Sequence, residues 1–222
     1  MFQQLSLFDF NTKGEYHVRQ IDYEDTKPFL LNIHYARRMP SIMYAYGLFS
    51  GIKLIGVCSY GMPASPSLCI GVGGVKYKYN VLELNRLAIL PEYSGKDNLA
   101  SYLVGQSLKM LPKNNYIVSY ADYGGWGHIG YVYQATNWLY TGMTKERTDK
   151  YSESGHSRHY KANEERRQIR TSKHRYIYIV ADSKTTRKQM KKDLKYKVIN
   201  NYPKGISRHY DTNNPVGLVR KD

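Results

Sequence analysis

The sequence lacks long apolar runs and has only two cysteines, and both absences narrow the class of protein. None of its hydrophobic stretches approaches the ~20 residues that a membrane-spanning helix needs. The start of the chain lacks the basic segment and small-residue cleavage site of a secretory signal. Cys58 and Cys69 fit no zinc or redox spacing. We therefore expect a cytoplasmic protein with reduced thiols and no membrane contact.

Acidic residues are also scarce. The chain holds 33 Lys and Arg against 18 Asp and Glu, a formal charge of +15, and the excess is uneven. Residues 1–144 carry 12 basic and 9 acidic residues, whereas residues 145–222 carry 21 and 9. A strongly basic second part beside a near-neutral body predicts a surface for nucleic acid. The 23 tyrosines offer flat faces that stack on bases, although tyrosine also fills half-wet cores.

Apolar periodicity predicts alternating strands and helices, and hence an α/β (α+β) fold with a central mixed sheet. The expected elements are a helix over 22–38, a hairpin of 42–49 and 53–60, a Pro/Gly loop over 62–74, strands over 81–90, 116–121, 138–142 and 174–182, and helices over 98–111, 131–136 and 184–196. We divide the chain into a flexible N-terminal peptide (1–12), a core (13–145), a polar arm or insertion (146–172) and a basic strand–helix extension of the same domain (173–222).

This order of elements resembles that of GNAT-type acyltransferases. In that fold two central strands splay apart, a cofactor enters the gap, and backbone amides of a glycine-rich loop before a helix hold pyrophosphate. The corresponding loop, PEYSGKDNLAS, has one glycine where the pattern carries two or three. The resemblance implies acetyl-CoA or a related small metabolite as donor, although it does not identify the donor. The residues that would hold it are Leu87, Ile89, Gly95, Asn98 and Leu99.

Four segments together resemble the phage Mom family of DNA-modification proteins. They are NIHYARRMPS, the stretch from VLELNRL to LPK, IVSYADYGGWGHIGYVYQATN, and SKHRYIYIVAD with its basic continuation. The resemblance implies a GNAT-like fold and a transferase that adds a carbamoylmethyl (acetamido) group to adenine N6 in double-stranded DNA. In that family the modification protects phage DNA from host restriction, and so the implied compartment is the cytoplasm of the bacterial host.

Several residues in these motifs are candidates for the chemistry. His34 and Tyr35 match the family's His-Tyr pair, and His34 would act as a base or a stacking clamp, or would only cap its helix. Arg86 lies on a predicted central strand and therefore needs an anion, which is Glu83, Asp122 or the donor. Strand alternation places Glu83 and Asn85 on one face and Arg86 on the other.

The segment around GGWGHIGY supplies the remaining candidates. Asp122 ends a strand, where it would accept a proton or only open a turn. Tyr131 or Tyr133 would serve as general acid, as a tyrosine on this helix does in related acyltransferases. Glu83, Asn85, Trp126 and His128 complete the expected pocket, with Trp126 either stacking on a base or packing in the core. No ligand spacing predicts a metal.

Clustered cations predict the contacts with double-stranded DNA, and Lys188, Lys191 and Lys192 form one stripe of the basic helix. The full set comprises Arg37, Arg38, Lys173, His174, Arg175, Arg187, Lys188, Lys191 and Lys192.

Residues 4–8, QLSLF, resemble the short peptide that docks bacterial polymerases and repair proteins on the DNA sliding clamp. Gln4 would enter a polar slot, and Leu5, Leu7 and Phe8 an apolar pocket. The alternative for this segment is an edge strand. For the whole chain, two alternatives to the DNA-modifying transferase remain open. One is a non-catalytic DNA-binding accessory protein on a decayed acyltransferase scaffold, and the other is an acetyl-CoA N-acyltransferase that acts on another amine.

Overall fold

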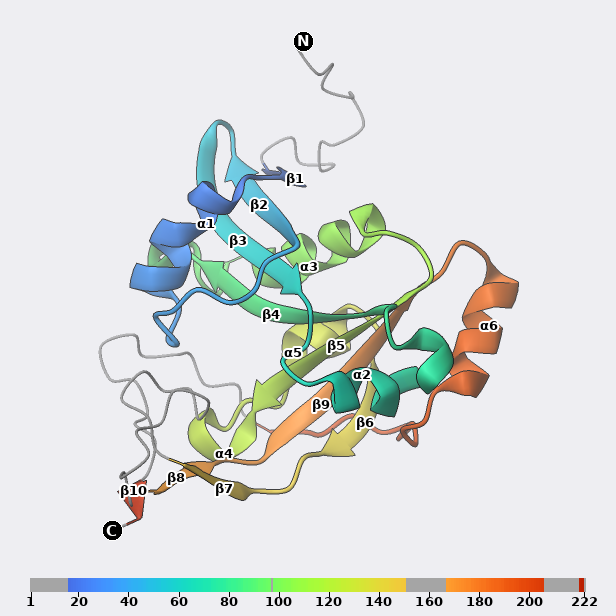
Figure 1. Ribbon diagram of the computed structural model, residues 1–222. Coiled ribbons are helices and arrows are strands. Elements are labelled where there is room, and N and C mark those ends of the chain that lie inside the picture. The colour runs from blue at the N-terminus through green and yellow to red at the C-terminus, as the bar shows by residue number, and fades with distance from the viewer. Residues whose placement is uncertain (1–15, 97, 151–166, 206–219, 222) are drawn as a thin grey trace.

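The computed structural model describes residues 16–96, 98–150, 167–205 and 220–221. Its centre is a seven-stranded mixed sheet in the order β1-β2-β3-β4-β5-β9-β6 (Figure 1). The strands are β1 (Tyr16–Gln20), β2 (Tyr44–Ser50), β3 (Lys53–Gly61), β4 (Val81–Ile89), β5 (Asn115–Asp122), β6 (Leu139–Met143) and β9 (Lys173–Val180). The α/β class and the strands of the core are therefore confirmed; β1 was not predicted.

Helices cover both faces of the sheet. They are α1 (Tyr23–Pro28), α2 (Pro66–Gly73), α3 (Leu99–Met110), α4 (Tyr123–Trp126), α5 (Tyr131–Ala135) and α6 (Lys184–Asp193), with short turns η1 (Phe29–Ile33), η2 (Val75–Tyr77) and η3 (Pro91–Tyr93). The helices α3 and α5 pack on one face, where buried Leu103 and Val104 join the largest apolar cluster. The opposite face carries η1 over one half of the sheet and α2 with α6 over the other (Figure 1).

The two central strands separate. The strands β4 and β5 are parallel, but they pair only where residues 81–83 face residues 116–118. The rest of β4 bonds to β3 alone, and the rest of β5 bonds to β9 alone. This splay is the GNAT-like feature that the order of elements predicts, and it leaves a gap in the middle of the sheet.

A β-bulge in β4 changes which side chains share a face. The register between β3 and β4 shifts at Asn85, because Ser59 faces Arg86 while the next residue, Tyr60, faces Leu84. A bulge inserts one extra residue and therefore reverses the alternation beyond it. Leu84 and Leu87, three residues apart, both pack on the α3 side. Glu83 and Arg86 consequently share the opposite face, and the prediction that alternation separates them is wrong.

The first helix is shorter than predicted. Pro28 lacks a backbone N–H, so the α-helical ladder cannot continue through it unchanged. The chain continues as the π-helical turn η1, closed by the bond from His34 N to Phe29 O (2.8 Å). π-turns concentrate at functional sites, and this one ends at His34, close to the central strand β4.

The predicted Pro/Gly loop is wrong in part, because it contains α2. Pro66 occupies the first turn, where a missing N–H costs nothing. Cys69 and Val72 are buried against β5 and β9. A Cβ on Gly73 would lie 2.5 Å from the Tyr116 ring, so this glycine permits a close approach of helix and sheet. Glycine and proline therefore allow a helix to form and pack here, and the local sequence pattern does not predict this helix.

The polar arm begins and ends in strands. β7 (Arg147–Lys150) pairs with β8 (Arg167–Arg170), which also pairs with β10 (Arg220–Lys221). The centre of the arm, residues 151–166, and the N-terminal peptide with QLSLF lie outside the described residues. No helix within the described ranges is both long and apolar enough to cross a membrane.

Candidate functional site

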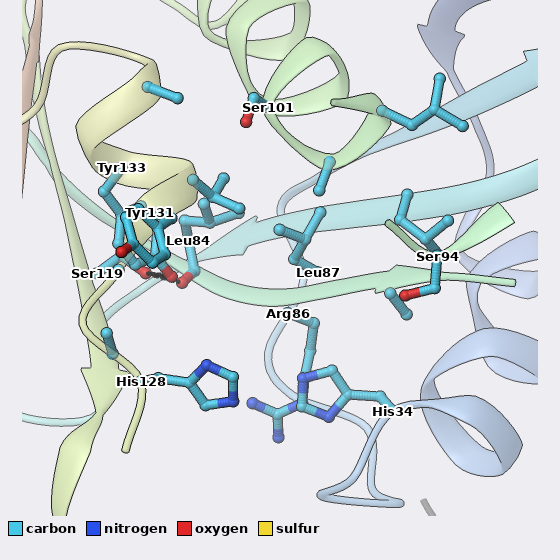
Figure 2. A pocket seen from close by; sticks show the side chains of 18 of the residues that line it. His34, Leu84, Arg86, Leu87, Ser94, Ser101, Ser119, His128, Tyr131 and Tyr133 are labelled. Atoms are coloured by element: carbon cyan, nitrogen blue, oxygen red, sulfur yellow. Dashed lines mark hydrogen bonds between the residues drawn. The ribbon is translucent and has the colours of Figure 1, made fainter. Parts of the chain in front are cut away.

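A cavity of about 1190 Å³ fills the gap between β4 and β5. Leu84 and Leu87 line it on the α3 side of the sheet, whereas His34 and Arg86 line it on the opposite side. Figure 2 shows the same division, with Ser101 of α3 on one side of β4 and His34, Arg86 and His128 on the other. The cavity therefore runs through the sheet rather than lying on one surface.

One end of the cavity lies at the start of α3, and we call it the donor end. All five residues expected to hold the donor line it: Leu87, Ile89, Gly95, Asn98 and Leu99. Gly95 and Asn98 both have positive φ angles, 79° and 55°. The first turn of a helix carries unpaired N–H groups and a partial positive charge, which favour anions. Exposed Lys96 adds a full charge at the same end.

His34 lines the opposite end, where it is buried and stacks on Tyr35 with ring centroids 4.4 Å apart. Its Nδ1 accepts a hydrogen bond from the backbone N–H of Ala36 (3.0 Å). A neutral imidazole that accepts at Nδ1 carries its proton at Nε2. Burial, with the charges of Arg86 and Arg38, lowers the pKa of His34 to about 3. His34 is therefore held as a neutral imidazole that offers its Nε2 proton to the cavity.

Arg86 reaches the same end of the cavity from β4. Its Nη1 donates to Asn85 O (2.6 Å), and its buried Nε has no hydrogen-bond partner among the described residues. Figure 2 shows the side chains of His34, Arg86 and His128 pointing toward one another. Within the described chain no carboxylate forms an ion pair with Arg86. A buried guanidinium in this state is suited to a carbonyl or anionic oxygen of a bound molecule.

The carboxylate at this end of the cavity is Glu83 rather than Asp122. Glu83 lines the cavity, and burial raises its pKa against the opposing influence of Arg86 and Lys173. Asp122 is not among the described residues that line the cavity. Its carboxylate accepts hydrogen bonds from Thr171 Oγ1 (2.8 Å) and from Lys173 Nζ. Asp122 thus ties the end of β5 to β9.

The two candidate tyrosines of α5 differ in environment. The Ser119 hydroxyl hydrogen-bonds Leu84 O at 2.9 Å and the Tyr133 hydroxyl at 2.8 Å, which places Tyr133 across the splay. Burial raises the pKa of Tyr133 to about 12, so it keeps its proton at neutral pH. Tyr131 also lines the cavity but is 46% exposed, and it donates to Gly205 O. Tyr133 is therefore the better placed proton donor.

One cation lines the end of the cavity that holds His34, and others lie near it. Lys173 lines the cavity and its side chain is 31% exposed. The charge of Arg170 lowers the pKa of Arg38, and the charge of Arg38 lowers the pKa of Arg86, so these three side chains lie near one another. The charge of Arg147 lowers the pKa of Tyr120 in the same way. We call Arg38, Arg147, Arg170 and Lys173 the cationic rim. Asp149 pairs with two of its members and Asp122 with a third, so the rim keeps a net positive charge.

The basic helix α6 lies elsewhere. It follows Val180, which pairs with Asn115 at the start of β5, whereas the cavity lies toward the end of β5. Figure 1 accordingly shows α6 at the opposite end of the sheet from β7 and β8. The predicted DNA contacts thus fall into two separate groups, and Arg187, Lys188, Lys191 and Lys192 of α6 are exposed far from the cavity.

Two further residues predicted to contact DNA have partners inside the fold. His174 is buried, and its Nδ1 hydrogen-bonds the Tyr140 hydroxyl (2.8 Å). Arg175 donates to Thr141 and lies 3.5 Å from the Tyr196 ring centroid. Neither side chain is placed as a surface phosphate contact. Exposed Arg37 adjoins the rim, and the side chain of Trp126 lies outside the described residues.

Sequence reasoning did not assign roles to Ser119 or Tyr120, which both line the cavity. They stand on opposite faces of β5, so each serves one side of the splay. Alternation along β5 predicts that the two side chains point to opposite faces. Only the separation of β4 from β5 exposes both of them to the same cavity.

Comparison with known proteins identifies the family of this chain. The model of the Mom protein family matches residues 15–204. The chain belongs to the Mom protein family. No curated protein matches this Mom-family chain.

Among solved structures, this Mom-family chain is similar to the ribosomal-protein-S18-alanine N-acetyltransferase of Escherichia coli (TM-score 0.45, 9% identity, 76% of this chain and 96% of that one). It is also similar to an N-acetyltransferase of Staphylococcus aureus (0.46, 12%, 74% and 98%) and to a GNAT-like decarboxylase in complex with isobutyryl-CoA (0.42, 12%, 74% and 99%).

Proposed function

We propose that this protein is a transferase that places a carbamoylmethyl group on adenine N6 of double-stranded DNA and so protects phage DNA from restriction. The observation that carries the proposal is the cavity through the splayed sheet. It joins the start of α3, which is suited to an anion, to buried His34 and partly buried Arg86 and Glu83 beside the cationic rim. A base held in duplex DNA must leave the stack to reach such a pocket, and phosphates must be held nearby while it does.

The donor end suits a molecule with an anionic portion, as coenzyme A thioesters and related metabolites have. For this product the donor must itself carry the carbamoylmethyl group, because acetyl-CoA alone would leave an acetyl group on N6. The first turn of α3 and Lys96 would hold the negative charge, while Leu87 and Ile89 would contact the apolar stem. Arg86 and the Nε2 proton of His34 would polarise the oxygen of the transferred group. The transfer would form a bond from adenine N6 to the methylene carbon of the group and break the bond from that carbon to the leaving atom of the donor. Glu83, which lines the cavity, would take the N6 proton, and Tyr133 would supply a proton to the leaving group.

Nucleoside mass spectrometry tests the proposal. Plasmid DNA made with the protein should contain a deoxyadenosine of higher mass that is absent without it. Arg86→Gln should abolish this nucleoside, because Arg86 lines the cavity. Lys53→Gln is the matched control, since Lys53 is an exposed cation paired with Glu92. Unmodified DNA with the wild-type protein in every host background would refute the transferase.

The single glycine of the donor loop, Gly95, favours a second candidate, a DNA-binding accessory protein without catalysis. The same experiment separates the two. Tight DNA binding with no shifted nucleoside supports the accessory protein, whereas a shifted nucleoside excludes it. An acylated amine outside DNA would instead support an ordinary N-acyltransferase.

The peptide QLSLF at residues 4–8 lies outside the described residues, and docking on the host sliding clamp remains a proposal. A tether raises the effective concentration of an enzyme near replicated DNA. Purified clamp should bind the wild type and not the Leu7→Ala, Phe8→Ala double variant. Equal binding of the wild type and the double variant would disprove docking through this peptide.

A further inference from the structure

The Glu83 carboxylate and the Tyr120 hydroxyl form a pair in the cavity for which the described contacts give no role. Both residues line the cavity. Neither side chain has a hydrogen-bond partner among the residues that the structure describes. Their proximity shows in the Tyr120 pKa, which is raised by burial first and then by the Glu83 charge. Both side chains are partly buried and face the cavity, so their hydrogen-bonding capacity is available to a bound molecule.

The fold brings this pair together by two devices. The bulge at Asn85 leaves Glu83 on the face opposite α3 together with Arg86. Tyr120 is on the same face of β5, where it packs with the cluster that holds Val118. The strands pair at Glu83 and Val118 and separate beyond that point. The pair therefore lies where the splay begins, at the closed inner limit of the cavity.

Several other polar groups of this region cannot accept a hydrogen bond from an N–H group of a ligand, because they already accept bonds within the protein or are donors. His34 offers only a donor, because Ala36 N–H occupies its Nδ1. Asp122 already accepts from Lys173 and Thr171. Arg86 and Lys173 are donors. Glu83 is thus a carboxylate that lines the cavity with capacity left to accept, and neutral Tyr120 is a donor beside it.

We propose that Glu83 and Tyr120 recognise the edge of the acceptor base, with Glu83 accepting from its exocyclic amino group and Tyr120 donating to the adjacent ring nitrogen. This inference rests on the proposed function and names the specificity element of the same site. Adenine and cytosine present an amino donor beside a ring acceptor. Guanine and thymine place a carbonyl oxygen where adenine has its amino group, and this oxygen would face the Glu83 carboxylate. The pair therefore selects amino bases and rejects carbonyl bases.

The test measures binding, so it does not depend on the unidentified donor. Two duplexes are compared, each with one base opposite an abasic position. In one duplex the base is adenine, and in the other it is purine, which lacks only the amino group. Wild-type protein should bind the adenine duplex about tenfold more tightly, as one charge-assisted hydrogen bond predicts. Glu83→Leu should remove this preference, and Glu83→Gln, which keeps an acceptor oxygen, should retain part of it.

Tyr120→Phe gives an independent readout. Both duplexes present the ring nitrogen, so this variant should weaken both by a similar factor and leave the preference unchanged. Glu92→Gln, on an exposed carboxylate paired with Lys53, is the control and should behave as wild type. An unchanged adenine preference in Glu83→Leu overturns the inference while a shifted deoxyadenosine still upholds the transferase. If the wild type binds neither duplex, both the inference and the DNA acceptor fail.

Discussion

The position of DNA on this protein can be tested by neutralising the cationic rim. The triple variant Arg38→Gln, Arg147→Gln and Arg170→Gln removes three charges from the neighbourhood of the cavity. Each cation that neutralises a phosphate contributes about 0.9 to the slope of log affinity against log salt concentration. Removing three contacts should therefore reduce the slope by about 2.7. Between 50 and 200 mM salt, the salt-induced loss of affinity should be about fortyfold smaller than in the wild type.

The control carries the same change of charge on α6. Lys188→Gln, Lys191→Gln and Lys192→Gln removes three exposed charges from the far end of the sheet. Fluorescence anisotropy with a labelled duplex at several salt concentrations gives the slope for each protein, and circular dichroism shows whether each variant is folded. If the α6 variant loses slope and the rim variant does not, the duplex binds at α6 and the cavity is not its docking site.

Three further predictions concern stability and the site. His34 has a pKa of about 3 in the folded protein against 6.5 ordinarily, so only the unfolded state binds its proton between these values. Stability should fall by about 1.4 kcal/mol per pH unit as pH drops below 6, and His34→Gln should remove this contribution in urea titrations, whereas equal slopes would disprove it. Tyr60→Phe removes the buried hydrogen bond between the Tyr60 and Ser107 hydroxyls (2.6 Å), while Ser107 keeps its bond to Val104 O, and should cost about 0.5–1.5 kcal/mol by the same method. Asp122→Asn weakens the bridge to Lys173 and should lower the melting temperature while nucleoside modification persists; loss of modification at full stability would return Asp122 to the chemistry.

Local pattern predicted the fold well where periodicity and tertiary packing agree. The hairpin, the strand β4, the helix α3 and the strand β9 all follow from runs whose apolar side chains are buried as expected. The helix α2 and the shortened α1 were missed for opposite reasons. Glycine and proline are accepted in α2 because it packs closely on Tyr116, whereas Pro28 interrupts α1 although the apolar pattern runs on.

The motifs pointed to several residues that line the cavity, but not to the partners of these residues. The motif residues His34, Arg86 and Tyr133 do line one cavity. Their roles depend on partners that the sequence does not reveal, such as the Ala36 N–H that fixes the His34 tautomer. The bulge at Asn85 places the side chains of β4 beyond it on the face opposite to the expected one. Simple alternation along a strand does not predict an inserted residue. The charge stripe of α6 was real, but only the fold shows that it lies away from the cavity.

The three-residue contact between β4 and β5 has a consequence for turnover. Since the gap runs through the sheet, the two reactants of the proposed reaction would approach from different sides and would not need to pass one another. A spent donor can leave beside α3 while a long polymer remains seated across the other entrance. The protein could then carry out several rounds of reaction during one encounter with the polymer, because a new donor molecule would enter beside α3.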